Sequence, residues 1–349
     1  MKNMGPARAA LCALALSSAL AAAQSMDPAA VARLEGDARA KALVEGAKRE
    51  GEVMVYHSTQ TEDLKPVFDA FTKKYGVKVR DWRSSSENVV SRVINETRVG
   101  KHEVDFIENN APEMEALRRE KMLLRMESPH FADMREGTLP AHHEYATSTI
   151  DVFVAAYNTK KVRREELPKT YDDLADPRWK GRLGIEAEDQ AWFGTLLHGL
   201  GEAKGVKLFG DIVAKNGISV RKGHTLLAQL VATGEIPLAL TVYGYKPQQM
   251  KAKGADIDWV ALPPTVAQLH SVAVHGKAAH PFAAMLLFDF FLGEGQAILA
   301  ERSFMAANRN VPSAFADIRL RFIDGPEALD RQVQWTKLYE DTIVKRSGG

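Results

Sequence analysis

Two tyrosines stand two residues apart where an apolar run ends, in the stretch IPLALTVYGYKPQQM (residues 236–250). In an extended chain Tyr243 and Tyr245 would point to the same side, roughly 7 Å apart, and would converge on one ligand. Gly244 between them would let the backbone bend. Phenolates bind a trivalent metal ion if the ion supplies the roughly 4 kcal/mol needed to deprotonate a group of pKa about 10 at pH 7. Alternatively, one ring packs against a wall and the other donates a hydrogen bond to an organic ligand.

Four polar segments, each directly before a predicted helix, supply the second group of candidates. Free N–H groups and the helix dipole favour a bound anion at such places. Ligands of open α/β sheets bind beyond the carboxyl ends of the strands, so we expect these segments to gather at one cleft. The alternative for each segment is an ordinary helix cap. The segments are His57-Ser58-Thr59-Gln60, Ser84-Ser85-Ser86, Asn109-Asn110 and Lys222-Gly223-His224-Thr225.

Basic and aromatic side chains near these segments extend the candidate site. Arg83, Lys222 and Lys246 would neutralise a carboxylate, phosphonate or phosphate, or else they are solvated surface charges. Trp192 and Phe193 would form an apolar wall of the cleft, or else they pack in the core.

Motifs of catalysis are not found in the sequence. It has no G-x-S-x-G, no H-E-x-x-H and no phosphate-loop motif, and GLGEAKG only approximates a dinucleotide fingerprint. His142-His143 followed by Glu144 lacks the spacing of a zinc helix. We therefore expect a protein that is not an enzyme and that has no cofactor, with a periplasmic enzyme as the less favoured alternative.

The N-terminus has the pattern of a secretory signal peptide. Lys2 and Arg8 precede a short apolar stretch, and small residues end at Ala23. That stretch is about fifteen residues long, against roughly twenty for a membrane span. Cys12, the only cysteine, lies inside it, so the mature chain would contain none. We predict cleavage and a periplasmic location, with no membrane insertion of the mature chain.

The net charge of the chain is close to zero. Forty-six Lys and Arg oppose forty-five Asp and Glu, which gives a formal charge of +1. This balance offers no general attraction to nucleic acid or to an anionic membrane, so any ligand preference must come from a local site.

Strand, loop and helix patterns alternate along the chain and predict an α/β fold with largely parallel sheets. We expect two lobes, each a mixed, mostly parallel sheet flanked by helices, joined by two extended crossover strands. The predicted divisions are a signal peptide at 1–23, a helical leader at 24–50, the first part of lobe 1 at 51–148, a hinge crossover at 149–156, lobe 2 at 157–257, a second hinge crossover at 258–275, the return of lobe 1 at 276–315, and C-terminal helices at 316–349.

Four stretches resemble the family-1 extracellular solute-binding proteins of ABC importers, and within them the ferric-iron and small-anion branch. They are GEVMVYHSTQTEDLKPVFDAFTKKYGVKV, LADPRWKGRLGI, ATGEIPLALTVYGY and HPFAAMLLFDFFLGEGQAIL, and they follow the family's order from about residue 51 to 315. The resemblance implies a two-lobed periplasmic binding protein fold with its ligand in the interlobe cleft.

The resemblance also implies which residues would hold iron. Ferric-binding relatives use two adjacent tyrosines, often with a histidine and a carboxylate from the other lobe. Here Tyr243 and Tyr245 are separated by one residue, the histidine position falls near Gln60, with His57 three residues earlier, and the carboxylate position falls near Asn110, with Glu108 two residues earlier.

We therefore predict the periplasmic receptor of an ABC importer, a monomer that closes around its ligand and delivers it to a permease. The expected cargo is Fe3+, with or without a bridging anion, held by Tyr243 and Tyr245. The alternative cargo is a small organic anion such as a phosphonate, carboxylate or phosphate ester. The expected ligand-binding residues are Tyr243, Tyr245, His57, Ser58, Thr59, Gln60, Ser84, Ser85, Ser86, Asn110, Lys222 and His224.

Overall fold

The computed structural model describes residues 27–347, so the predicted signal peptide lies outside the described residues. Its strands are β1 (Glu52–His57), β2 (Lys78–Arg83), β3 (Phe106–Asn110), β4 (Ala146–Asn158), β5 (Leu183–Glu186), β6 (Ser219–Arg221), β7 (Leu238–Tyr243), β8 (Ile257–Val260), β9 (Thr265–Val274), β10 (Met305–Ala306) and β11 (Leu320–Phe322).

Helices cover both faces of the sheet. The α-helices are α2 (Pro28–Val31), α3 (Gly36–Glu50), α4 (Thr61–Tyr75), α5 (Ser86–Arg98), α6 (Ala111–Arg119), α7 (Gln190–Leu200), α8 (Glu202–Asn216), α9 (His224–Thr233), α10 (Tyr245–Ala252), α11 (Pro281–Leu292), α12 (Gly295–Glu301), α13 (Gly325–Asp330), α14 (Gln332–Tyr339) and α15 (Lys345–Ser347).

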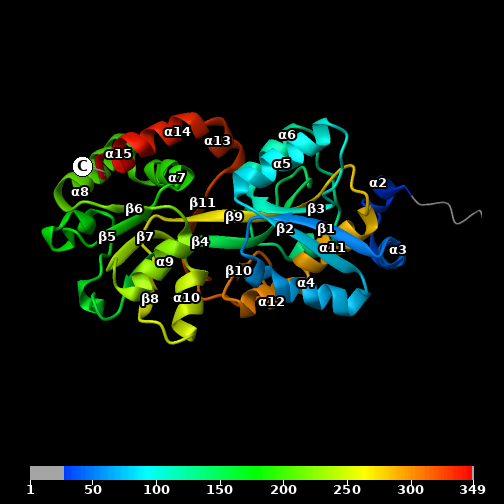
Figure 1. Cartoon of the computed structure of the whole chain (residues 1–349), viewed down its shortest axis with the longest axis horizontal. Helices are drawn as coiled ribbons and strands as arrows, with labels where there is room; N and C mark the ends of the chain where they lie inside the picture. Colours follow the sequence, from blue (N-terminus) through cyan, green and yellow to red (C-terminus); the bar gives the residue numbers. More distant parts are fainter. Residues whose placement is uncertain (1–26, 348–349) are drawn as a thin grey trace, which may run out of the picture.

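The strands follow the order β2-β1-β3-β9-β4-β7-β5-β6, with β8, β10 and β11 pairing beside this path. Figure 1 shows two lobes side by side, each with helices above and below its part of the sheet. This is the two-lobed α/β architecture that the sequence predicts. Parallel pairing lies within each lobe, whereas β4 and β9 pair antiparallel with their neighbours, except that β9 is parallel to β11.

Lobe 1 is built on the three parallel strands β1, β2 and β3. One face of this sheet packs against α3, α4 and α11, and the other against α5 and α6. Pro281 occupies the first turn of α11, where its missing N–H costs no hydrogen bond, and ten of the twelve residues of this helix are buried. Each strand ends at the same edge of the sheet and leads into a helix.

Lobe 2 repeats this plan with the parallel strands β5, β6 and β7. Helices α7 and α8 pack on one face with α14, and α9 packs on the other. The carboxyl ends of these strands, at Glu186, Arg221 and Tyr243, lead into α7, α9 and α10.

Strands β4 and β9 connect the lobes. They pair with each other, for example Ile150 with Leu269, and the far end of β4 continues into lobe 2, where Val154 pairs with Val242 of β7. Strand β11 pairs with β9, and the C-terminal helices then pack across both lobes, α13 on α6 and α14 on α7. In Figure 1 this red C-terminal segment arches over the sheet.

In residues 27–347 no single helix is long and apolar enough to cross a membrane. The bent pair α11 and α12 together reaches the required length and apolarity.

Candidate functional site: an interlobe cleft

A cleft of about 490 Å³ lies where the strand ends of the two lobes face each other. Its walls come from the loops after β1, β2 and β3 on one side and after β5, β6 and β7 on the other. The two connecting strands contribute Asp151, Gln268 and His270, and the C-terminal segment adds Gln332 and Trp335. The polar segments expected to gather at strand ends therefore meet at one place.

Lobe 1 contributes six of the expected ligand-binding residues to the cleft. Thr59 donates a 2.6 Å hydrogen bond to Glu108, and Ser85 caps α5 by accepting from the N–H of Asn88. Ser86 accepts a 2.9 Å hydrogen bond from the side chain of Asn110. Gln60 precedes α4 and makes no side-chain cap. The six residues are Ser58, Thr59, Gln60, Ser85, Ser86 and Asn110.

Two of the expected residues in lobe 1 lie outside the cleft lining. His57 is buried, with its ring nitrogens 2.9 Å from the carbonyl oxygen of Thr59 and 3.1 Å from Asp81. Ser84 accepts a hydrogen bond from the side chain of Asn88. Lys246, a candidate for neutralising an anion, is also buried, and it donates to Asp63 at 2.7 Å.

Three of the four remaining cationic and aromatic candidates, Arg83, Lys222 and Trp192, line the cleft. Arg83 donates to the carbonyl of Ser58, and Lys222 forms a 2.6 Å ion pair with Glu188. Trp192 is buried and yet contributes to the lining, whereas Phe193 lies in the core of lobe 2. Of this aromatic pair, Trp192 therefore forms part of the cleft wall and Phe193 packs in the core.

A buried group of charged side chains forms the floor of the cleft. His270 of β9 lies 2.8 Å from Glu108 of β3 and 3.4 Å from Asp151 of β4. Burial alone would raise the pKa of Glu108, but the neighbouring imidazolium lowers it to about 2. In turn, the two carboxylates overcome the effect of burial on His270 and raise its pKa to about 10. Oδ1 of Asp151 is buried without a hydrogen-bond partner.

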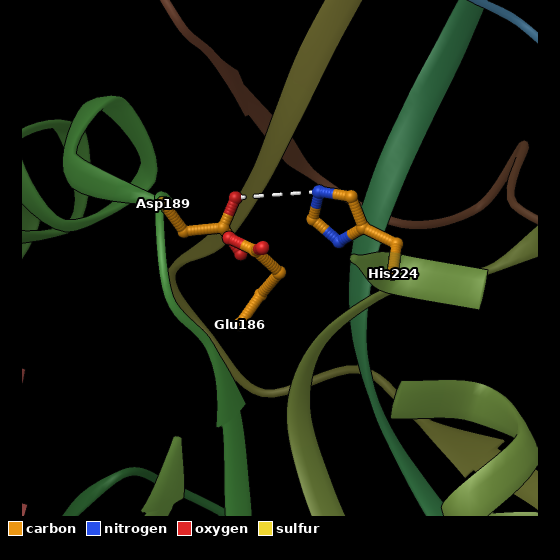
Figure 2. A group of neighbouring side chains, drawn as sticks. All are labelled: Glu186, Asp189 and His224. Atoms are coloured by element: carbon orange, nitrogen blue, oxygen red, sulfur yellow. Dashed lines mark ion pairs between the residues drawn. The ribbon is translucent and has the colours of Figure 1, made fainter. Parts of the chain in front are cut away.

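The lobe 2 wall brings together Glu186, Asp189 and His224, whose potential ligand atoms all lie within 4.8 Å of one another. Glu186 ends β5, Asp189 directly precedes α7, and His224 begins α9. Figure 2 shows the three side chains pointing toward one another, with the imidazole of His224 facing the carboxylate of Asp189. Burial, opposed by the nearby His224, raises the pKa of Asp189 to about 7.

The two tyrosines belong to a column of aromatic rings beside this group. The ring of Tyr243 lies 3.9 Å from that of His224, and the ring of Tyr245 lies 4.0 Å from that of Phe304. The two phenol rings are nearly parallel, with centroids 6.1 Å apart. Burial and nearby carboxylates raise the pKa of each phenol well above 10, so deprotonation requires a strongly attracting cation.

The backbone at Gly244 corrects one expectation. Tyr243 is the last residue of β7 and Tyr245 the first of α10, and Gly244 between them has φ −58° and ψ −25°, which any residue adopts. A Cβ there would lie 2.5 Å from the ring of Phe315. Glycine is therefore needed for space and not for a special bend.

Several polar residues of the cleft were missed by sequence reasoning: Asp151, Glu186, Asp189 and His270. A signal existed for two of them, because the acidic run Glu186-Ala187-Glu188-Asp189 lies between a predicted strand and a predicted helix. Asp151 and His270 are ionisable residues inside strands that are almost entirely buried, and such residues are rare at buried positions.

Carboxylates outnumber permanent cations in the cleft lining. The lining cations are Arg83, Lys222 and His270, whose raised pKa keeps it protonated, and the lining carboxylates are Glu87, Glu113, Asp151, Glu186, Glu188 and Asp189. Burial raises the pKa of Glu113 to about 7, and its Oε2 has no hydrogen-bond partner. The electrostatics of the site therefore favour a ligand that carries positive charge.

The chain belongs to a family of bacterial extracellular solute-binding proteins, whose model matches residues 109–325. It is 25% identical over 329 residues to the major ferric iron-binding protein of Neisseria gonorrhoeae, covering 88% of this chain and 97% of that protein. It is 25% identical over 197 residues to the Fe(3+)-binding periplasmic protein of Serratia marcescens, where the match covers 56% of this chain and only 57% of the relative.

Solved structures share the two-lobed fold. Iron-bound HitA from Pseudomonas aeruginosa superposes with a TM-score of 0.73 at 20% identity, covering 83% of this chain and 99% of HitA. The periplasmic binding protein AfuA from Actinobacillus pleuropneumoniae, with fructose-6-phosphate bound, gives 0.73 at 19% identity, covering 84% and 99%. At these identities the likeness establishes the fold.

Proposed function

We propose that this protein is the periplasmic receptor of an ABC importer and that it captures ferric iron in the interlobe cleft. The excess of buried carboxylates beside two phenols at the cleft is the observation that carries this proposal. Carboxylate and phenolate oxygens are hard donors, which suit a small trivalent ion. The curated relatives named above, which are iron-binding proteins, support the same cargo.

Delivery would depend on closure of the two lobes about β4 and β9. A ligand that contacts both walls only in the closed form binds that form more tightly and shifts the population toward it. A permease would then recognise the closed shape of a monomeric receptor. This role is a binding function, with iron as transported cargo and no chemical turnover.

A titration of the mature protein with ferric citrate tests the cargo. We expect saturable binding of one iron and a visible charge-transfer band from phenolate ligation, which Tyr243→Phe or Tyr245→Phe weakens. Tyr75→Phe is the control, because Tyr75 packs against Phe71 and Phe290 away from the cleft. A protein that retains no iron after gel filtration contradicts the ferric function.

A small phosphorylated or carboxylated organic anion is the second candidate. Arg83 and Lys222 line a cleft much larger than a single ion, and α5, α6 and α9 begin at its edge. AfuA, which has this fold, was solved with a sugar phosphate. Calorimetry with fructose-6-phosphate on the iron-free protein tests this candidate, with Arg83→Gln as the variant expected to weaken binding about tenfold.

A further inference from the structure

Asp189 occupies the N-cap position of α7, but its side chain makes no capping hydrogen bond. Aspartate before a helix usually accepts a hydrogen bond from the first turn, but Asp189 makes no side-chain cap to α7. Its side chain is 7% exposed, and its Oδ2 has no hydrogen-bond partner. A buried carboxylate oxygen left without a partner carries a desolvation cost, which a bound cation would offset.

The imidazole of His224 faces the carboxylate of Asp189 with its Nε2 atom. Its Nδ1 lies 2.9 Å from the carbonyl oxygen of Thr241, which only accepts, so Nδ1 carries the proton and donates. In the neutral form of the ring, which is the form that binds metals, the lone pair is therefore on Nε2, and this atom faces Oδ1 of Asp189 at 3.5 Å. Metal-binding histidines are oriented in this way by a hydrogen bond from the other ring nitrogen. The ring of Tyr243, whose centroid lies 3.9 Å away at an interplanar angle of 32°, also restricts the imidazole.

Glu186 is fixed by its backbone surroundings. The N–H of Gly223 donates to Oε1 at 2.8 Å, and the N–H of Glu188 donates to Oε2. Each oxygen keeps a further lone pair for a cation. These two hydrogen bonds join the loop before α7 to the loop before α9, so they place Glu186 between the other two side chains.

The spacing of the three groups suits one metal ion. Carboxylate and imidazole donors lie about 2.1 Å from a bound first-row metal, so donors of one ion are at most about 4.2 Å apart. The potential ligand atoms of the three residues are within 4.8 Å of one another, and a small rotation of the side chains brings them within about 4.2 Å. Within the described residues neither Glu186 nor Asp189 forms an ion pair with a lysine or an arginine, since Lys222 pairs with Glu188.

We infer that Glu186, Asp189 and His224 form a preassembled half-site on lobe 2 that binds a first-row transition-metal ion through two carboxylates and one imidazole. The inference rests on the proposed function for its choice of iron as the natural ion. It assigns first capture of the ion to lobe 2 in the open cleft, before lobe 1 contacts it, and it does not require adjacent tyrosines.

The decisive variant is Asp189→Asn, which keeps the shape of the side chain and removes its charge. His224→Gln is the second variant, and circular dichroism checks that both fold. Glu235→Gln is the matched control, because it removes a carboxylate from lobe 2 at a residue outside the cleft lining. Each protein is titrated with ferric citrate and, separately, with Co2+, and bound metal is measured by elemental analysis after gel filtration.

For each metal, we expect Glu235→Gln to bind as tightly as the unmodified protein. We expect Asp189→Asn and His224→Gln to lose affinity for each metal by about 100-fold or more. Iron binding that is unchanged in both cleft variants overturns this inference and leaves the ferric function standing. Cobalt binding that depends on Asp189, in a protein that does not take up iron, supports the half-site and overturns the ferric cargo. Binding of neither metal overturns both.

Discussion

Oδ1 of Asp189 lies 3.5 Å from Nε2 of His224, while Oδ2 of the same carboxylate is buried with no hydrogen-bond partner. One oxygen thus faces the imidazole, and the other has no partner in the cleft wall. Such an arrangement lowers the stability of the empty protein, and natural proteins keep such features where a ligand uses them.

The first prediction follows for the stability of the metal-free protein. Asp189→Asn removes a buried charge that lacks a full set of partners, so we expect the free energy of unfolding to rise by about 1 kcal/mol. Urea denaturation in the presence of a chelator measures this difference. An Asp189→Asn protein that is less stable than the unmodified chain would show that the carboxylate has a structural role.

The second prediction concerns pH and the Glu108–His270 pair. The folded pKa of Glu108, about 2, lies below its usual 4.5, so the stability that this group provides is present above pH 4.5 and is lost as pH falls toward 2. The folded pKa of His270, about 10, lies above its usual 6.5, so its contribution is present below pH 6.5 and is lost as pH rises toward 10. The pair therefore contributes most between about pH 4.5 and 6.5.

Thermal unfolding from pH 3 to 10 tests this, with a double variant, Glu108→Gln with His270→Gln, as reference. We expect the difference in melting temperature between the two proteins to be largest near pH 5.5 and to shrink on both sides. A difference that does not change with pH would contradict the assignment of charge to this pair.

The third prediction concerns a buried contact between the lobes. Lys246 of α10 and Arg302 after α12 both donate to Asp63 of α4 at 2.7 Å, and Gln249 adds a bond at 3.0 Å. Lys246→Met removes one of the two cations that face the buried Asp63 carboxylate and leaves Arg302 as its charged partner, so we expect the protein to be destabilised by about 2 kcal/mol.

Lys251→Met is the control for that change, because Lys251 lies on the same helix and forms a 2.7 Å pair with Asp258 at the surface. Chemical denaturation should show a loss below about 1 kcal/mol for this exposed pair. Equal losses in the two variants would mean that burial of the Asp63 pair adds nothing.

The fold follows from local patterns to a large extent. Helix starts at Ser85 and Pro281 are encoded by capping chemistry and by the fixed φ of proline, which act over a few residues. The polar segments before α4, α5 and α6 reach the cleft because the carboxyl ends of parallel strands share one edge of a sheet.

The details of the site depend on packing between distant segments. The side chain of His57 points into the core, where it pairs with Asp81 of the neighbouring strand. Successive side chains of a strand point to opposite faces of the sheet, so an error of one residue in placing the strand end puts a side chain on the wrong face. Asp189 and His224 are 35 positions apart and meet only because β5 and β6 are neighbours. No spacing within the sequence indicates that meeting.

The fourth prediction concerns the residue between the two tyrosines. A Cβ at Gly244 would lie 2.5 Å from the ring of Phe315 and 3.3 Å from Val154, so Gly244→Ala forces the strand end and the aromatic ring apart. Overpacking of this kind costs about 1–3 kcal/mol, and it would also displace Tyr243 from His224. We expect lower stability and weaker iron binding in Gly244→Ala, measured by denaturation and by ferric citrate titration.

The double variant Gly244→Ala with Phe315→Leu is the control for this change. It should recover part of the stability and part of the iron binding, because the shorter side chain removes the ring atoms that clash with the new Cβ. No recovery in the double variant would show that the glycine is needed for its backbone and not for the space beside it.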